Sequence, residues 1–404
     1  MTIGLVTPYF PDKQTIDSGI ANHYLLLAES LAELKHKVIV MHVRPSYAAE
    51  ETFELEYTLG NVRVLTFRVA LSEPAEKILG KNWAARDFAL KIKCMIRTGE
   101  ILKNSILKYG IQVVETSSYF SLCYFFLKKN RPVPVAVRVS TTFSQIMNDY
   151  YPFRSRLLQL IGRMEIQMLK KSQFLLTHAH SHAQELQALY GIDSAAFTII
   201  PHGIRVPPLP CTGTSEHRPV KVLFVGRLEF RKGIDVLLDA IPVILKQNTG
   251  VHFEIIGNDP GKAYEKQFLA KNNAETSQKV TFMGKTSQDA LKKAYGECDI
   301  FVAPSRYESF GLIFIEAMSY GKPVVGCDVG GVSQIIRHGA NGLFAENGNP
   351  ESLAERIEQL IKDPGLRMAM GVNARKTVED QFTGRQLAES SAIYYASLIS
   401  TTRD

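Results

Sequence analysis

The stretch SRYESFGLIFIEAMSYG, residues 305–321, places two glutamates eight positions apart in an otherwise mostly apolar segment. Glu308 lies beside a polar Ser-Phe-Gly step, and Glu316 lies inside an apolar run that continues to Met318. A carboxylate removed from water destabilises a protein unless it is paired or hydrogen-bonded. The second part of the stretch has the apolar pattern of a buried helix, and that helix offers Glu316 no partner. The sequence therefore predicts that the hydrogen bonds to Glu316 come from outside its own helix.

Residues 305–321 follow the strand candidate DIFVAP (299–304), so a helix is expected to begin after a strand end, near Gly311. A glycine lets the backbone approach a ligand closely. The first N–H groups of a helix have no partner within it, and the helix dipole favours an anion beside them. If the segment is helical throughout, Glu308 and Glu316 lie roughly 12 Å apart along the axis, at about 1.5 Å per residue.

That span suits a ribose, a diphosphate and a sugar ring, with Glu316 on the ribose hydroxyls and Glu308 on the sugar. The alternative is a buried ion pair between Glu316 and a nearby lysine or arginine.

Two further segments follow strand candidates in this half of the chain. In VGRLEFRKGID (225–235), Arg227 and Lys232 come between a strand and a helix that begins near Gly233. Two cations beside free helix N–H groups suit a phosphate or diphosphate, although surface cations after a strand are common. In CDVGGVSQII (327–336), a Gly-Gly step opens a helix and is either a tight turn or a neighbour of the sugar.

Apolar, β-branched runs alternate with longer helical stretches along the chain. The predicted strands are 3–8, 37–43, 62–67, 112–115, 133–139, 174–177 and 197–201, then 220–226, 251–257, 279–284, 299–304, 323–326 and 342–345. In the first half, helices are predicted over 18–35, 86–109, 118–129 and 154–171, and further helices separate the later strands. This alternation predicts an α/β fold of parallel sheets with helices on both faces.

A proline-rich segment, RVPPLPCTGTSEHRPV (205–220), separates the two halves and is typical of an interdomain linker. We therefore expect two Rossmann-like, doubly wound domains in series, over 1–204 and 220–383, with a linker at 205–219. Ligands of such sheets bind at the carboxyl ends of the strands, so the two domains are expected to face a central cleft.

The net charge of +7 is unevenly distributed, because the balance is +7 up to Arg205 and zero beyond it. Two helical stretches, 86–108 and 152–171, place basic residues between apolar ones. They are either helices with solvated basic faces or surfaces attracted to an anionic membrane or an acidic acceptor. No nucleic-acid-binding motif occurs, so nucleic acid is not expected as a partner.

The remaining bulk features exclude several classes of protein. No apolar run of about 18 residues predicts a transmembrane helix, and the N-terminus lacks the regions of a signal peptide. Five scattered cysteines form no C-x-x-C pair, which favours reduced cytosolic thiols over a zinc site. No G-x-G-x-x-G follows the first strand, so a dehydrogenase is not expected. We expect a cytoplasmic protein, with peripheral contact to the inner membrane face as an open alternative.

The order and spacing of these segments resemble the donor domain of the retaining GT-B glycosyltransferases of family 4. The resemblance rests on GRLEFRKGIDVLLDAI (226–241), VTFMGK (280–285) and residues 301–344, where Glu308 and Glu316 form the E-x7-E signature. In the first half, SGIANHYLLLAESLAELKHKV (18–38) and IIPHGI (199–204) are similar to the family's first glycine-containing loop and its domain-closing step. The signature is specific for fold and reaction class and poor for substrate.

The resemblance implies a nucleotide-sugar site in the second domain. Arg227 and Lys232 should neutralise the diphosphate, Glu316 should hold the ribose, and Glu308 should contact the donor sugar. Arg227, Lys232 and Glu308 are the predicted catalytic groups. The rest of the implied donor site consists of Phe310, Gly311, Leu312 and Ile313, the main chain of Met283 near the base, and Gly19 of the first domain near the phosphates.

The family's last helix crosses back to the first domain, which assigns 384–404 to that domain. The resemblance implies no divalent metal and no other cofactor, in agreement with the lack of an Asp-x-Asp motif at a strand end.

On the acceptor side the sequence departs from the family. Many relatives carry a histidine at the end of the strand that corresponds to 133–139, where this chain has Ser140. A serine can hydrogen-bond a hydroxyl, but it does not exchange protons near neutral pH as histidine does. Glu115, at the end of its predicted strand, is either an acceptor-side group or a loop carboxylate.

The histidines of the first half are not expected to bind a metal. His178, His180 and His182 have the spacing of a metal site, but a change from strand to helix near 181 turns their side chains apart. His202 is expected to shape the turn before the linker.

We therefore expect a retaining glycosyltransferase that moves a sugar from a UDP or GDP carrier to the hydroxyl of a glycan, a lipid-linked molecule or a small molecule. No nucleophile is placed for a double displacement, so the family's front-face route is implied, in which the departing phosphate helps to deprotonate the acceptor. One alternative is a catalytically silent nucleotide-sugar-binding partner subunit. Another is an enzyme that uses the same site to make or phosphorolyse a disaccharide.

Overall fold

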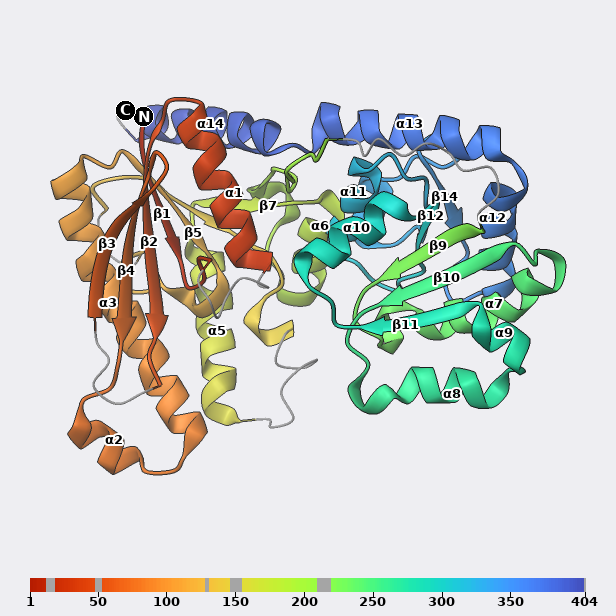
Figure 1. The fold of residues 1–404 in the computed structure, drawn as a ribbon. Coiled ribbons are helices and arrows are strands. Elements are labelled where there is room, and N and C mark those ends of the chain that lie inside the picture. The colour runs from red at the N-terminus through yellow and green to blue at the C-terminus, as the bar shows by residue number, and fades with distance from the viewer. Residues whose placement is uncertain (12–18, 48–52, 128–130, 146–154, 209–218, 403–404) are drawn as a thin grey trace. The chain divides into compact units, whose positions relative to one another are not determined.

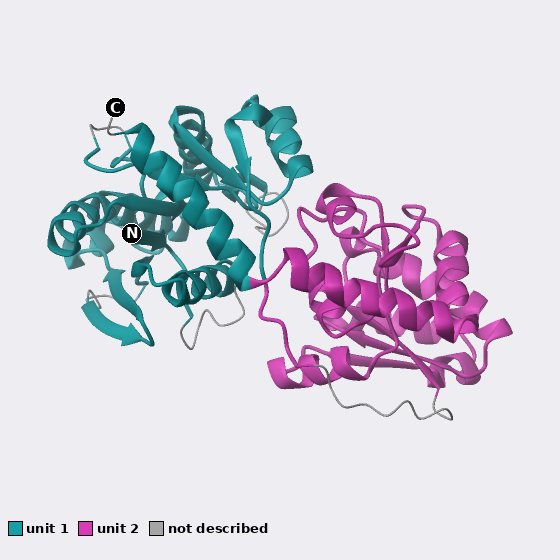
Figure 2. Ribbon diagram, turned by 90° about the horizontal axis from the view of Figure 1, so that it is seen from above, with its two compact units in different colours: residues 1–203, 384–404 teal, residues 204–383 magenta. Residues whose placement is uncertain are grey.

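The computed structural model describes residues 1–11, 19–47, 53–127, 131–145, 155–208 and 219–402. The chain divides into two compact units: unit 1 comprises Met1–Gly203 with Gly384–Asp404, and unit 2 comprises Ile204–Thr383 (Figure 2). Most of the predicted linker, residues 209–218, lies outside the described residues. Each unit contains a mainly parallel sheet flanked by helices, which confirms the predicted α/β class (Figure 1).

Unit 1 has an eight-stranded sheet within the described residues, in the order β3-β4-β2-β1-β5-β6-β7-β8, and β3 is its antiparallel strand. Its strands are β1 (Thr2–Thr7), β2 (Lys37–Pro45), β3 (Phe53–Leu59), β4 (Val62–Val69), β5 (Val113–Ser117), β6 (Val135–Arg138), β7 (Phe174–Thr177) and β8 (Phe197–Ile199). Its helical elements include α1 (Gly19–Glu33), α2 (Glu73–Leu79), α3 (Trp83–Tyr109), η1 (Tyr119–Ser121), α5 (Arg156–Lys171), α6 (His180–Tyr190), η2 (Ser194–Ala196) and α14 (Gly384–Thr401).

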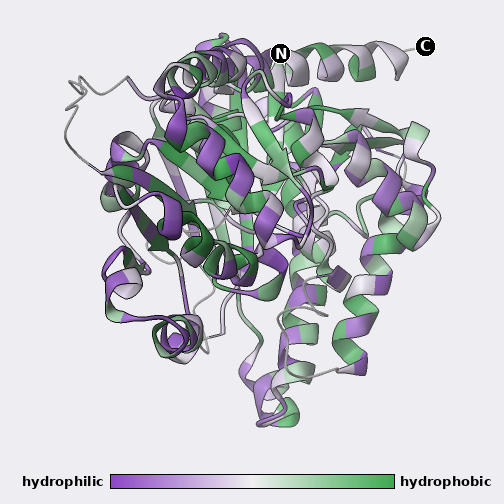
Figure 3. Ribbon diagram, turned by 90° about the vertical axis from the view of Figure 1, so that its right-hand side faces the viewer, coloured by the Kyte–Doolittle hydropathy of each residue, from purple (hydrophilic) through white to green (hydrophobic). Residues whose placement is uncertain are grey.

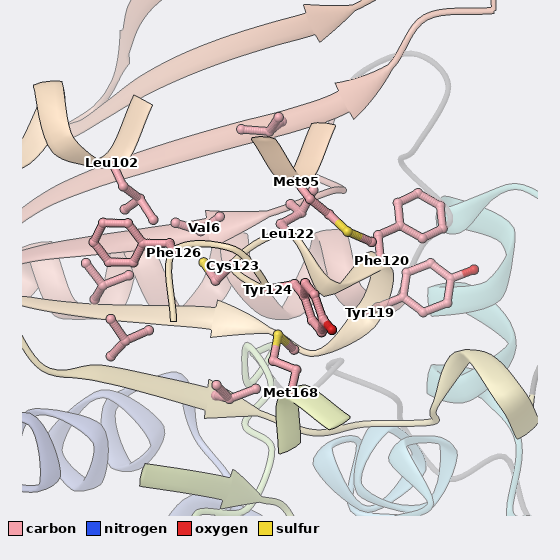
Figure 4. Close-up of a cluster of buried hydrophobic side chains, with 14 of the residues drawn as sticks. Val6, Met95, Leu102, Tyr119, Phe120, Leu122, Cys123, Tyr124, Phe126 and Met168 are labelled. Carbon is pink, nitrogen blue, oxygen red and sulfur yellow. The ribbon is translucent and has the colours of Figure 1, made fainter. Parts of the chain in front are cut away.

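Neighbouring residues of the central strands of unit 1 belong to two different hydrophobic cores. Val6 and Met41 contribute to a core shared with α3 and α5, part of which Figure 4 shows. Leu5 and Val40 contribute to a core shared with α1 and α14. Successive side chains of a strand point to opposite faces, so these continuous apolar strands are covered by helices on both sides.

Two local predictions in unit 1 are wrong. The helix predicted over 118–129 does not form in the described part of that range, where η1 is followed by turns. Phe120 and Ser121 have φ values of 65° and 51°, which no right-handed helix can contain. The edge strand β3 was not predicted, because most of its side chains are exposed and it lacks the continuous apolar run of the inner strands.

Unit 2 has a six-stranded, all-parallel sheet within the described residues, in the order β11-β10-β9-β12-β13-β14. Its strands are β9 (Val220–Val225), β10 (Val251–Ile256), β11 (Val280–Gly284), β12 (Ile300–Ala303), β13 (Val324–Cys327) and β14 (Gly342–Ala345). Its helical elements include η3 (Phe230–Lys232), α7 (Ile234–Gln247), η4 (Pro260–Lys262), α8 (Ala263–Lys271), α9 (Ala274–Gln278), α10 (Gln288–Glu297), α11 (Leu312–Ser319), η5 (Gly330–Gln334), α12 (Pro350–Lys362) and α13 (Pro364–Gln381). Figure 3 shows hydrophobic strands between helices of mixed hydropathy, as expected for helices that bury one face.

Helix α14 returns to unit 1 and packs along α1, as expected from the resemblance. A Cβ atom on Gly384, at the start of α14, would lie 2.5 Å from Oγ of Ser30 on α1. Farther along, Leu387 and Tyr395 are buried in the core that α1 shares with the sheet. The chain therefore passes from one unit to the other twice, after Gly203 and after Thr383. None of the described helices is both long and apolar enough to cross a bilayer.

Candidate active site

The strand order of unit 2 brings the three predicted segments to one place. Strands β9 and β12 are neighbours in the sheet, although β10 and β11 separate them in sequence. The strand order thus reverses direction between β9 and β12, and doubly wound sheets bind their ligands at the carboxyl ends of strands at such a point. Strand β13 follows β12 in the sheet, so the loops after β9, β12 and β13 lie side by side at one edge.

Lys232 and Glu308 meet at this edge. Lys232 ends η3 after β9, and its Nζ lies 2.5 Å from Oε1 of Glu308, which follows β12. Oγ of Ser305 donates to the same carboxylate oxygen over 2.9 Å. The Glu308 side chain is 9% exposed and that of Lys232 is 15% exposed. Because both side chains of the pair keep some exposed surface, an anion that enters the site can contact Lys232 together with Glu308 or in its place.

A glycine brings the two loops together. Gly233 has a φ of +67° at the start of α7, and a Cβ atom there would lie only 1.9 Å from the carbonyl oxygen of Pro304. Only a residue without a side chain allows backbone to approach backbone this closely. The loop after β9 is thereby pressed against the loop after β12, which fixes the separation of Lys232 and Glu308.

Arg306 braces the same two loops. Its Nη1 and Nη2 donate over 2.8 Å to the two carboxylate oxygens of Asp235 on α7. Its guanidinium carbon lies 3.7 Å from the centroid of the exposed Phe230 ring, and its main-chain N–H donates to Arg231 over 2.8 Å. A bidentate arginine contact of this kind fixes orientation as well as distance.

The second predicted cation, Arg227, lies on the same loop. Its Nη2 is 3.0 Å from Oε1 of Glu229, which also accepts a contact from Arg231 at 3.1 Å. The Arg227 side chain is about one-third exposed. The structure thus places both predicted cations between β9 and α7, where Lys232 is paired with Glu308 and Arg227 with Glu229.

The Gly-Gly step predicted after β13 packs directly on the loop that carries Glu308. Gly331 N donates to the carbonyl oxygen of Glu308 over 2.9 Å. A Cβ atom on Gly330 would lie 2.0 Å from that same oxygen, and one on Gly331 would lie 2.5 Å from the Ser309 carbonyl oxygen. The two glycines therefore hold the backbone of residues 308–310, a role that sequence spacing alone did not reveal.

Helix α11 begins at Leu312 and not at Glu308. The predicted start near Gly311 is confirmed, and the φ of +101° at Gly311 means that residues 308–311 do not extend the helix, so the condition for the rise of about 12 Å is not met. Phe310 is buried, whereas Leu312 and Ile313 are partly exposed. The free N–H groups of the first turn of α11 therefore lie at the switch point, next to the loop of Glu308.

Glu316 receives its hydrogen bond from a tyrosine. The hydroxyl of Tyr295, on α10, donates to Oε2 of Glu316 over 2.8 Å. Burial raises the pKa of Glu316 above its ordinary value, and the hydrogen bond from Tyr295 lowers it part of the way back. The alternative of a lysine or arginine partner is thus not what the described residues show. Tyr295 was not predicted from the sequence, because its contact with Glu316 depends on how α10 packs against α11.

The remaining predicted donor residue of unit 2, Met283, lies on the edge strand β11 and is 42% exposed. Gly19 and Ser140 belong to unit 1 and are not part of the unit 2 cluster. Gly19 is exposed at the start of α1, and a Cβ atom there would meet nothing within 4 Å. Ser140 follows β6 and is partly exposed.

The proposed acceptor role of Glu115 is wrong, because its side chain is fully buried within β5. Its Oε1 lies 2.7 Å from Nε of Arg138 and its Oε2 lies 3.0 Å from Nη2 of the same arginine. The Tyr395 hydroxyl of α14 also donates to Oε2, over 2.6 Å, and Arg138 reaches Ser391 Oγ at 3.4 Å. We call Glu115, Arg138, Ser391 and Tyr395 the Arg138 cluster. It joins α14 to the sheet and leaves Glu115 without contact to solvent.

Four histidine rings pack against one another beside this cluster, two pairs stacked and the His23–His202 pair edge-on. Ring centroids lie 4.5 Å apart for His178 and His182, 4.8 Å for His178 and His202, and 4.9 Å for His202 and His23. We call these four residues the histidine stack. His180, the third member of the predicted spacing pattern, is exposed at the start of α6. Within the described residues no group of histidine, cysteine and acidic side chains is arranged to hold a metal ion.

Burial lowers the pKa of His23, His182 and His202. It lowers the pKa of His182 to about 4. Burial, and then the charge of Arg138, lower the pKa of His23 well below its ordinary value. Burial and then His23 act in the same direction on His202. The ring of His202 is thus part of a packed group from two helices, α1 and α6, and the segments after β7 and β8, whereas the sequence predicted only a role in a turn.

Two family models match the chain in succession. The family described as Glycosyltransferase Family 4 matches residues 18–206, and the family described as Glycosyl transferases group 1 matches residues 213–377. The first match covers most of unit 1, and the second covers the candidate site in unit 2.

Individual relatives agree with these matches. An uncharacterized glycosyltransferase of Methanocaldococcus jannaschii is 36% identical over 174 residues, which is 43% of this chain and 44% of that protein. The chain thus spans less than half the length of that curated relative. A glycogen synthase of Mycobacterium tuberculosis is 25% identical over 98% of this chain and 94% of its own length. The solved sucrose-phosphate synthase of Thermosynechococcus elongatus has a TM-score of 0.69 at 20% identity, over 99% of this chain and 100% of that one, a likeness of fold.

Proposed function

We propose that this chain is a glycosyltransferase of the kind that the two matching families describe, and that it moves a sugar from a UDP or GDP carrier to an acceptor hydroxyl with retention of anomeric configuration. The observation that supports this most strongly is the pairing of Lys232 with Glu308 at the switch point of unit 2, 2.5 Å apart and beside the start of α11. A cation, a sugar-binding carboxylate and free helix N–H groups are the three elements that a nucleoside diphosphate sugar requires.

In this proposal the donor lies across the loops after β9, β12 and β13. Lys232 and Arg227 neutralise the diphosphate, assisted by the N–H groups of Gly311, Leu312 and Ile313. Glu316 accepts hydrogen bonds from the ribose, and the main chain of Met283 borders the base. Glu308 keeps Lys232 and Ser305 on Oε1 and accepts hydrogen bonds from the sugar hydroxyls on Oε2, because a carboxylate has enough lone pairs for both sets of partners.

The chemical step breaks the bond between the anomeric carbon and the β-phosphate oxygen, and a bond from the acceptor oxygen to the same carbon forms on the same face. The departing phosphate oxygen takes the proton of the acceptor hydroxyl, so the atoms balance without a protein nucleophile. Charge develops on the leaving diphosphate, where Lys232 and the α11 N–H groups are already oriented to stabilise it. We propose that these groups suffice and that no divalent metal is needed.

The acceptor is assigned to unit 1 on the strength of the resemblance. Ser140 after β6 is the remaining predicted contact for an acceptor hydroxyl, since Glu115 is buried. The predicted role of Gly19 near the phosphates stays a prediction. The amphipathic α5 supports a peripheral, reversible contact with an anionic membrane surface, because its exposed residues include Arg156, Arg163 and Lys170.

The donor proposal is tested by thermal unfolding against UDP, GDP, ADP and TDP and their sugars, without metal. A ligand that binds the folded state raises the melting temperature by mass action. We expect one nucleotide to stabilise the wild type and to have little effect on Lys232→Ala. Lys246→Ala, which removes an exposed lysine at the far end of α7, should respond like the wild type.

If none of the nucleotides stabilises the wild type, the donor site is refuted and the silent partner subunit becomes the better explanation. Proton NMR of the product reports the anomeric configuration, and an assay in a chelator tests the independence from metal. The membrane contact predicts binding to anionic vesicles that weakens as the salt concentration rises. Lack of binding at low salt would remove it.

A further inference from the structure

Tyr295 is placed to orient the carboxylate of Glu316. Its side chain is 2% exposed on α10, and its hydroxyl lies 2.8 Å from Oε2 of Glu316 on α11. A buried tyrosine hydroxyl needs a hydrogen-bond partner, and a carboxylate makes a stronger one than a neutral group. Here the phenol is the donor, because burial and the charge of Glu316 raise the pKa of Tyr295 well above its ordinary value.

The two oxygens of Glu316 have different surroundings. Oε2 accepts the hydrogen bond from Tyr295, whereas Oε1 has no partner among the residues that the structure describes. The Glu316 side chain is neither fully buried nor fully exposed. One oxygen is therefore held by the protein, and the other keeps its lone pairs for a group that arrives from outside.

The tyrosine itself is held by its neighbours. Its ring stacks on Tyr320 at a centroid distance of 5.9 Å with an interplanar angle of 16°, and it lies 5.8 Å from the ring of Phe301. Nζ of Lys322, just after α11, donates over 2.8 Å to the carbonyl oxygen of Gly296, the residue after Tyr295. The end of α10 is thus tied to the end of α11, and the direction of the phenol O–H bond is fixed by packing.

We propose that Tyr295 is a positioning residue that holds Glu316 ready for the ribose and so makes the site selective for ribonucleotides over deoxyribonucleotides. This inference rests on the donor site proposed above. A glutamate on a free helix surface loses the freedom of three side-chain torsions when it binds a ligand. With Oε2 already held by Tyr295, much of that loss occurs on folding and not on binding, which is preorganisation.

The test compares the nucleoside diphosphate that stabilises the wild type with its 2′-deoxy and 3′-deoxy forms by isothermal titration calorimetry. We expect the wild type to bind the ribonucleotide about 10-fold or more tightly than the deoxy forms, as for a hydrogen bond to a charged group. Tyr295→Phe should reduce this ratio to about 2-fold or 3-fold, because the carboxylate is no longer oriented. Tyr320→Phe, which keeps the ring stack and removes a hydroxyl that does not bind Glu316, should keep the wild-type ratio.

A double variant separates positioning from a merely structural role. If Tyr295 acts through Glu316, Tyr295→Phe combined with Glu316→Gln should discriminate no less than Glu316→Gln alone, since the same interaction is removed once. Additive losses, or an unchanged ratio in Tyr295→Phe, would overturn the inference while leaving the donor site intact. A wild type that binds none of the diphosphates would overturn both, so the two failures are distinguishable. If Tyr295→Phe does not fold, the ratio of ribonucleotide to deoxyribonucleotide affinity in Glu316→Gln decides. A ratio equal to that of the wild type would show that Glu316 does not bind the ribose, and the role of Tyr295 would be refuted with it.

Discussion

The Arg138 cluster of unit 1 and the Lys232–Glu308 pair of unit 2 each contain an ion pair, yet they differ in how their carboxylates are satisfied. Glu115 has both oxygens bound, by Arg138 and by Tyr395, and has no exposed surface. Among the described residues, Glu308 accepts hydrogen bonds from Lys232 and Ser305 on Oε1 alone, and its side chain retains some exposure. Glu115, with both oxygens bound, stabilises the fold. Glu308, with these two bonds on Oε1, has a second oxygen available to a ligand.

The largest expected effect is on stability and follows from breaking the Glu115–Arg138 pair. Arg138→Met leaves Glu115 buried with only Tyr395 as a partner, and losing one member of a buried ion pair costs about 3–5 kcal/mol of unfolding free energy. The single tryptophan, Trp83, lies in unit 1, so its fluorescence during urea unfolding follows this unit. Nucleotide affinity per folded molecule should not change.

The double variant Arg138→Met with Glu115→Leu should recover much of this loss, because no unpaired charge remains inside. If the single variant loses nucleotide affinity but no stability, the contrast between the two ion pairs is reversed.

The next largest effect is on activity and concerns the Lys232–Glu308 pair. Lys232→Ala should lower the transfer rate by about 10²–10³-fold, the usual effect of removing one group that stabilises charge in the transition state. Stability should fall less than for Arg138→Met, since Glu308 keeps Ser305 as a partner and some contact with solvent, whereas Glu115 is fully buried. Steady-state assays with the cognate donor, alongside thermal unfolding, measure both quantities. A drop in stability as large as that of Arg138→Met would show that the pair is structural.

A smaller effect, on nucleotide binding, is expected where the backbone at Gly331 packs on the loop of Glu308. Gly331→Ala places a Cβ atom 2.5 Å from the Ser309 carbonyl oxygen, so the loop of Glu308 has to move. Forcing an extra methyl group into a packed position costs about 1–3 kcal/mol. Gly250→Ala, at a turn where a Cβ atom meets nothing within 4 Å, is a control for general glycine effects. Calorimetry with the cognate nucleotide should show weaker binding for Gly331→Ala than for Gly250→Ala.

The smallest effect is the pH dependence of unit 1. Burial lowers the pKa of His182 to about 4, whereas unfolded histidine titrates near 6.5. Between these values the unfolded chain binds the extra proton, so this contribution to stability is complete above about pH 6.5 and is lost as the pH falls toward 4. His182→Gln should reduce the slope by at most about 1.4 kcal/mol per pH unit.

Urea unfolding followed by Trp83 fluorescence between pH 7.5 and pH 4.5 measures this slope. The exposed His180 on the same helix provides the matched variant, His180→Gln. If both variants have the same pH dependence, the histidine stack does not contribute as proposed. Buried carboxyls act in the opposite direction: burial raises the pKa of Glu165 to about 7, which favours the folded state at low pH.

The fold of unit 2 was predictable because its central strands, β9, β12 and β13, are short, mostly apolar runs with β-branched residues and are largely buried. Lys232 and Glu308 could be predicted as partners in one site because both follow strand ends, and the strand order reverses between them. The edge strand β3 was missed since its side chains are largely exposed and carry no hydrophobic signal. The helix over 118–129 was wrong because the positive φ values of Phe120 and Ser121 come from tertiary packing and not from local preference.

The partners of the buried carboxylates could not be predicted from the sequence. Tyr295 contacts Glu316 across 21 positions, through the packing of two helices. Glu115 meets Arg138 only because β5 and β6 are neighbours in the sheet, and it meets Tyr395 across 280 positions. Spacing along the chain carries no information about such contacts. The need of a buried carboxylate for a partner was therefore predictable, whereas the identity of the partner residue was not.

The return of α14 to unit 1 also determines the order of assembly during synthesis. A nascent chain that has completed β5 and β6 already contains Glu115 and Arg138, but Tyr395 emerges only after the 180 residues of Ile204–Thr383 have been added. At about 5–20 residues per second, the first-made unit waits roughly 10 to 35 s for its last helix. Unit 2 is contiguous and can close in that interval, so the part of the protein that is translated second is the first that can be finished.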